Sequence, residues 1–129
     1  MKRLLTYISA VLMISLSSFA LLENTDEIVD ALQKGDATEL SRFFDDNVQL
    51  SMPSKTDSYS KAQARIIIKD FFSLNEVKGF ELKNKGNAPG GVYLLGIMQT
   101  GSTSFRVHVF IKQVNGKDLI HELRFQPLE

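Results

Sequence analysis

Cysteine and tryptophan are both absent from this 129-residue chain, and neither sign of charge is in excess. The absence of cysteine excludes disulfide bonds, thiolate zinc sites, iron–sulfur clusters and a cysteine nucleophile. Fifteen Lys and Arg residues balance fifteen Asp and Glu residues, so the chain lacks the basic excess typical of nucleic-acid-binding proteins. With 43% hydrophobic and 23% charged residues, the composition is that of one ordinary globular domain.

The first residues of the chain have the pattern of a secretory signal peptide. Lys2 and Arg3 precede an apolar stretch from Leu4 to Leu16, and the small residues of the segment 17–20 follow it. This order predicts export and removal of residues 1–20. An uncleaved membrane anchor is the alternative, although the apolar run is shorter than the about 20 residues that a membrane span needs.

Residues 21–129 are expected to form a single exported domain, in the periplasm or outside the cell. Loss of the two basic residues Lys2 and Arg3 from fifteen leaves 13 against 15 acidic residues, a net charge of −2. An exported domain without disulfides must depend on its hydrophobic core, which suits a bacterial envelope protein better than a eukaryotic secreted one.

Three helices and a short strand are predicted in the first half of this domain. Three capping-box spacings, in which Asn, Asp or Ser precedes Glu or Gln by three residues, predict helix starts near residues 24, 36 and 60. Gly35 is expected to end the first of these helices. Residues 48–52 alternate between apolar and polar as a short strand does. Residues 53–59 are polar and are expected to form a loop.

Four strands are predicted in the second half, at residues 80–83, 92–100, 105–112 and 119–126. Asn115-Gly116 between the last two favours a hairpin with a type I′ turn. The expected fold class is α+β, with the helices packed on one face of a curved antiparallel sheet. That face is expected to carry Phe80, Leu82, Phe105, Val107, Val109, Ile111, Leu119, Leu123 and Phe125.

The start of the domain resembles that of nuclear transport factor 2-like proteins. The stretch Ala31–Leu40, continued by Phe43–Val48, reads as a helix, a Gly-Asp corner, a second helix and an acidic turn into a strand. Within this superfamily the chain is most similar to small secreted bacterial domains of unknown function. The resemblance implies a cone-shaped fold of order α-α-β-α-β-β-β-β, with a pocket between the long helix and the concave sheet. Members include ketosteroid isomerases, dehydratases, polyketide cyclases and pure binding domains, so the fold does not decide the function.

The pocket of the cone is the predicted ligand site. An apolar concavity of this kind suits a small apolar or amphipathic ligand. We therefore expect a non-catalytic domain that binds such a ligand or a protein partner, with no cofactor and no metal. The residues expected to line the pocket are Phe43, Met52, Tyr59, Phe72, Tyr93 and His121.

His121 is the one candidate catalytic residue. Alternation with Leu119 and Leu123 places its side chain toward the pocket, where a neutral imidazole can act as a general base. The alternative function is therefore a small isomerase, dehydratase or cyclase. Against it, Glu122 points to the opposite face, so no carboxylate is placed to orient the ring. A structural histidine that hydrogen-bonds a backbone carbonyl is the favoured interpretation.

Two other polar groups are weaker candidates. His108 alternates onto the face opposite to His121, and two histidines on opposite faces do not make a metal site. Asp45 and Asp46 could bind a cation as paired carboxylates, but Asp residues after a helix more often form a polar turn.

The strand at residues 92–98 is apolar on both faces, which is typical of a strand covered on both sides. If the helices cover one face, a second copy of the chain is expected to cover the other. The alternatives are a monomer with an exposed apolar patch, and a purely structural partner that works through this face. The residues expected at the homodimer interface are Val92, Leu94, Met98, Phe110 and Ile120.

Overall fold

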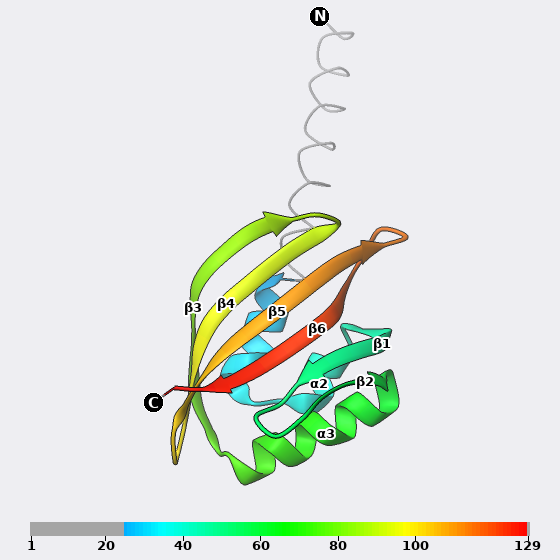
Figure 1. Cartoon of the computed structure of the whole chain (residues 1–129). Coiled ribbons are helices and arrows are strands. Elements are labelled where there is room, and N and C mark those ends of the chain that lie inside the picture. Colours follow the sequence, from blue (N-terminus) through cyan, green and yellow to red (C-terminus); the bar gives the residue numbers. More distant parts are fainter. Residues whose placement is uncertain (1–24, 129) are drawn as a thin grey trace, which may run out of the picture.

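The computed structural model describes residues 25–128, in which helices pack on one face of a curved six-stranded sheet (Figure 1). The predicted signal peptide, residues 1–20, lies outside the described residues. Across residues 25–128, none of the helices has the length and apolar character needed to cross a membrane. The elements in chain order are helix 25–34, α2 (Ala37–Ser41), β1 (Phe44–Ser51), β2 (Thr56–Ser60), α3 (Lys61–Leu74), β3 (Val77–Ala88), β4 (Gly91–Thr100), β5 (Ser104–Val114) and β6 (Lys117–Pro127).

The sheet has the strand order β2-β1-β6-β5-β4-β3. Strands β3 to β6 form the predicted antiparallel meander. The first strand, β1, pairs in parallel with the last strand, β6, and brings β2 to the edge of the same sheet. The β1–β6 pair therefore joins two segments that lie more than half the chain length apart in sequence.

Strand β2 corrects the prediction of a loop at residues 53–59. Its sequence is polar, and four of its five residues are exposed. A strand at the edge of a sheet needs a partner on one side only, and polar side chains are common there. Tyr59 is the half-buried member, and it faces the core from a position opposite Val48.

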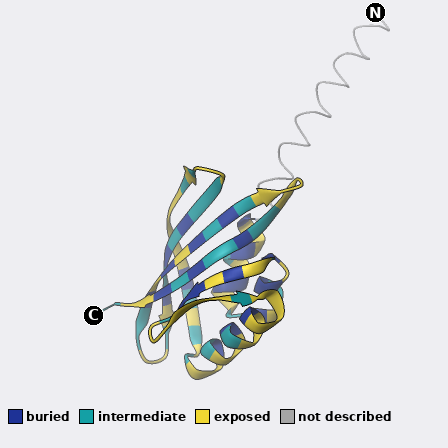
Figure 2. Cartoon of the chain, turned by 45° about the vertical axis from the view of Figure 1, so that its right-hand side comes forward, coloured by how far each residue is buried: buried dark blue, intermediate teal, exposed yellow. Residues whose placement is uncertain are grey.

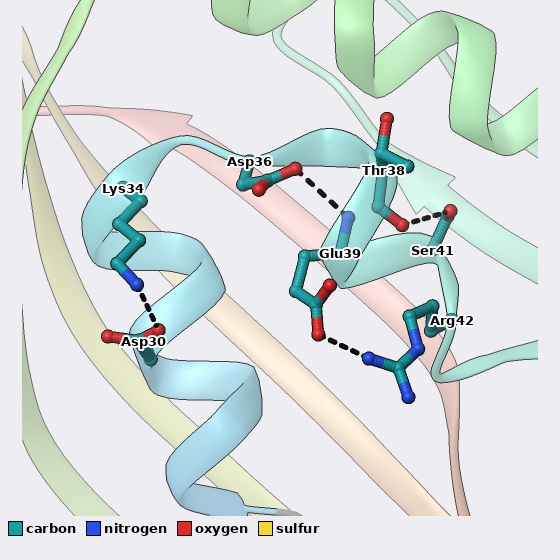
Figure 3. Close-up of polar contacts among 7 residues, drawn as sticks. All are labelled: Asp30, Lys34, Asp36, Thr38, Glu39, Ser41 and Arg42. Atoms are coloured by element: carbon teal, nitrogen blue, oxygen red, sulfur yellow. Dashed lines mark hydrogen bonds and ion pairs between the residues drawn. The ribbon is translucent and has the colours of Figure 1, made fainter.

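A tight corner joins helix 25–34 to α2 (Figure 3). Gly35 has φ +62°, and a side chain there would meet Val77 at 2.8 Å. Asp36 then begins α2, because its carboxylate accepts a hydrogen bond from the Glu39 backbone N–H at 3.0 Å. Glu39 is also 2.6 Å from Arg42 in an exposed ion pair. The predicted stop and start signals at this corner are confirmed.

Helix α3 begins with the predicted capping box. The Ser60 hydroxyl accepts from the Gln63 backbone N–H, and the Gln63 side chain accepts in return from the Ser60 backbone N–H, both at 3.3 Å. The apolar side of the helix buries Ala64, Ile68 and Phe72 against the sheet.

Aromatic rings fill the space between α3 and the sheet. The Phe71 ring lies 4.8 Å from that of Phe125 and 5.1 Å from that of Phe105, and the Phe72 ring lies 6.1 Å from that of Phe125. Rings at these separations are in packing contact. The middle of the helix-covered face is therefore a packed core.

The two faces of the sheet are distinguished by burial and register (Figure 2). We call the helix-covered face the inner face and the opposite one the outer face. Leu94 is opposite Val109 and Met98 is opposite Phe105 in the β4–β5 pair, and all four belong to the buried core.

The predicted outer position of Val92, Leu94, Met98 and Ile120 is therefore wrong. Leu94, Met98 and Ile120 are fully buried in the core, and Val92 is half-buried against it. Of the predicted interface residues, Phe110 alone lies on the outer face. Three apolar residues at odd-numbered positions of β4, namely Tyr93, Leu95 and Ile97, point outward instead.

A β-bulge in β6 explains why Ile120 and His121 were placed on the wrong sides. Phe110 pairs with Glu122, whereas the next residue, Ile111, pairs with Ile120. His121 is the extra residue, and the alternation reverses there. Because of this reversal, the predicted core residue Leu119 is only half-buried. Leu82, another predicted core residue, lies on the edge strand β3 and is 37% exposed.

Candidate functional site

The residues predicted to line one central pocket lie in separate parts of the molecule. Tyr93 lies on the outer face of the sheet, and His121 lies at the junction of β1 and β6. The other four pack in or against the core beneath the inner face: Phe43, Met52, Tyr59 and Phe72.

A hollow of about 480 Å³ lies on the outer face. Two rows of cross-strand neighbours run across the sheet at this place, and each row has one residue from each of the strands β3, β4, β5 and β6. Seven of these eight residues line the hollow together with Ala88, and the volume is within the usual range for small-molecule sites. The rows are Gly86, Tyr93, Phe110 and Glu122, and Asn84, Leu95, His108 and Arg124.

Tyr93 is positioned by a glycine on the neighbouring strand. A side chain at Gly86 would meet the Tyr93 ring carbon Cζ and hydroxyl at 2.5 Å, so the ring lies across the backbone of β3. On the other side, the Tyr93 ring is 6.0 Å from the His108 ring in an edge-to-face arrangement. The ring therefore spans from β3 to β5 and forms part of the floor of the hollow.

The floor of the hollow is apolar, and its β6 side is charged. Tyr93, Leu95 and Phe110 are each half-buried. On β6 the Arg124 Nη2 donates a hydrogen bond to Glu122 Oε1 at 2.9 Å. Both side chains keep solvent contact, with exposed fractions of 41% and 27%.

His121 lies beside a carboxylate that sequence reasoning missed. Its Nδ1 is 3.7 Å from Asp45 Oδ2, and its ring is 6.4 Å from that of Phe110. Nδ1 is buried and has no hydrogen-bond partner among residues 25–128. The prediction that no carboxylate neighbours this ring is therefore wrong, because the parallel pairing of β1 with β6 brings Asp45 to it.

His108 lies on the outer face as predicted and is exposed. Asp45 and Asp46 are part of β1 and not of a turn after a helix. Within residues 25–128, no group of three or more His, Cys, Asp and Glu side chains is arranged to hold a metal ion.

The chain has the fold of nuclear transport factor 2-like proteins. A crystal structure of an NTF2-like protein of unknown function from Shewanella baltica OS155 is similar, with a TM-score of 0.63 at 11% sequence identity. The match covers 89% of this chain and 96% of that protein. The resemblance noted at the sequence level is thereby confirmed.

Within this class the chain belongs to the DUF4783 family, a domain of unknown function that matches residues 25–126. A DUF4783 protein from Bacteroides ovatus ATCC 8483 is 28% identical, with a TM-score of 0.77 over 80% of this chain and 94% of that one. A second, from Bacteroides uniformis ATCC 8492, is 27% identical, with a TM-score of 0.77 over 81% and 96%. Comparison with curated proteins gives no match.

Proposed function

We propose that this protein is an exported, non-catalytic binding domain that holds a small apolar or amphipathic ligand in the outer-face hollow. The observation that carries the proposal is the incomplete burial of Tyr93, Leu95 and Phe110, which form the apolar floor of a concavity. Apolar concavities with a few polar groups at one side are the usual form of a ligand site. The proposal moves the site from the predicted central pocket to the outer face, because phenylalanine rings pack the middle of the inner face.

Binding of a neutral apolar fluorophore, N-phenylnaphthylamine, tests this proposal. We expect the wild-type protein to enhance its fluorescence, and Leu95→Asp to weaken binding at least about tenfold by placing a charge on the floor. Ile66→Asp is the matched control, because Ile66 is 55% exposed on α3. Equal binding by both variants would place the ligand elsewhere.

Export rests on the pattern of residues 1–20. N-terminal sequencing of the protein recovered from a bacterial periplasm is expected to start at Leu21. A recovered chain that starts at Met1 would favour the alternative, an uncleaved membrane anchor.

A homodimer through the outer face stays part of the proposal, with a revised set of residues. Tyr93, Leu95, Ile97 and Phe110 give this face a row of half-buried apolar side chains, and such rows are common at interfaces. Ile97 lies outside the lining of the hollow, so Ile97→Glu separates the two roles. In sedimentation we expect this variant to be monomeric and the wild type dimeric, with Ile66→Glu as the control; a monomeric wild type would contradict the homodimer.

The alternative function is an isomerase, dehydratase or cyclase with His121 as the base. The observation that favours it is Asp45, which lies close enough to His121 to orient the imidazole after a small movement. In an enzyme, His121→Ala abolishes turnover. In a binding domain, the same change leaves the fluorophore affinity within about tenfold.

A further inference from the structure

The outer-face hollow changes character from β4 to β6. Tyr93 and Leu95 on β4 give its floor aromatic and aliphatic surface, and Phe110 extends that surface onto β5. The next strand contributes the charged pair of Glu122 and Arg124. A ligand that lies across the strands therefore meets apolar side chains at one end and a guanidinium at the other.

Basic side chains from β5 and β6 lie on the outer face around the charged end. Three of the outward positions of β5 hold Arg106, His108 and Lys112, and His108 is the cross-strand neighbour of Arg124. Among residues 25–128, the acidic groups that face outward near the hollow are Glu122, which is paired with Arg124, and two more distant ones. These are Asp45, which faces His121, and Glu81, which pairs with Lys83 at 3.0 Å.

Most hydrogen-bond donors of the Arg124 guanidinium have no partner among residues 25–128. A guanidinium carries five N–H groups, and within residues 25–128 the side chain makes one hydrogen bond, from Nη2 to Glu122. The remaining donors form the planar fork that suits a carboxylate. At 41% exposure, the group is open to a ligand and already held in place by Glu122.

We infer that the hollow takes an amphipathic carboxylic acid. Its apolar chain or ring lies on Tyr93, Leu95 and Phe110, and its carboxylate meets Arg124, with His108 beside it. This inference rests on the proposed function and adds the chemical class of the ligand. A carboxylate fits better than a more highly charged head group, because one guanidinium faces the hollow and a carboxylate stands next to it.

A dansyl-labelled fatty acid and its methyl ester test this inference by fluorescence titration of the whole mature domain. The two probes share their apolar part and differ in the charge of the head group. We expect the acid to bind at least about tenfold more tightly than the ester, a difference of about 1.4 kcal/mol. In Arg124→Gln the acid is expected to lose this advantage, while the ester binds as before.

Arg65→Gln is the control, because Arg65 is exposed on α3 away from the hollow, and it should leave both affinities unchanged. Equal binding of acid and ester by the wild type would overturn the inference and leave the proposed binding function intact. Failure of both probes to bind, or binding that Leu95→Asp does not weaken, would overturn both.

Discussion

The two faces of the curved sheet are built from the same strands but are covered differently. On the inner face, Leu94 and Val109 are fully buried beneath the helices. On the outer face, their chain neighbours Leu95 and Phe110 remain half-buried, with side chains of the same apolar kind. The inner face is thus a complete core, whereas the outer face has apolar surface that the chain itself does not cover.

This contrast separates stability from function. Each Å² of apolar surface removed from water contributes about 25 cal/mol, so the inner face supplies most of the free energy of folding. The incompletely covered outer face contributes less, and it holds the hollow with Tyr93 and Arg124. We therefore assign folding to the inner face, and the proposed binding site lies on the outer face.

The largest expected effect is the difference in stability loss between two variants, one that removes a ring from the inner face and one that removes a ring from the outer face. Phe125→Ala on the inner face is expected to lower the free energy of unfolding by about 3–5 kcal/mol, because it leaves a cavity beside Phe71. Phe110→Ala on the outer face should cost about 1 kcal/mol, since that ring is already half-exposed. Urea unfolding measures both, and equal losses would remove the distinction between the faces.

A smaller effect is expected from filling the space under Tyr93. Gly86→Ala places a methyl group against the Tyr93 ring, which must swing away, so we expect a loss of about 1–2 kcal/mol and weaker binding of the dansyl fatty acid. Gly101→Ala is the control, because a side chain there meets nothing within 4 Å. Unchanged binding in Gly86→Ala would show that the ring does not shape the site.

Removing the capping box of α3 should affect stability, which depends on the inner face, and leave binding at the outer face unchanged. Ser60→Ala removes the capping box of this helix and is expected to lower the free energy of unfolding by about 1 kcal/mol. Binding of the dansyl fatty acid should stay as in the wild type. A parallel loss of binding would mean that the ligand contacts the helix side of the sheet.

The smallest effect is expected at His121. Its Nδ1 is buried without a hydrogen-bond partner among residues 25–128, so His121→Phe removes an unsatisfied group while keeping a ring beside Phe110. We expect a change in the free energy of unfolding of less than about 1 kcal/mol in either direction. A larger loss, measured by urea unfolding, would show that attraction to Asp45 stabilises the fold.

Local signals predicted the parts of the fold that depend on neighbours in sequence. The corner at Gly35-Asp36 and the capping box at Ser60 are where the spacing places them. Asn115 and Gly116 have φ of +52° and +77°, as the type I′ turn requires. Each of these features is decided within a few residues.

Features that depend on distant partners were missed. The pairing of β1 with β6 brings Asp45, which is distant in sequence, next to His121. No pattern within a few residues of either position indicates this contact. The bulge at His121 reverses the alternation of β6. In β4 both faces are apolar, so alternation separated Leu94 from Leu95 correctly but could not indicate which one the helices cover.

The most direct test of the account is to map ligand binding by backbone amide chemical shifts. The dansyl fatty acid is titrated into the isotopically labelled domain of residues 21–129. We predict the largest shifts in the two rows across β3 to β6, centred on Tyr93, Leu95 and Phe110. Shifts concentrated around Phe71 and Phe72, between α3 and the inner face, would instead reveal a central pocket and contradict the assignment of binding to the outer face.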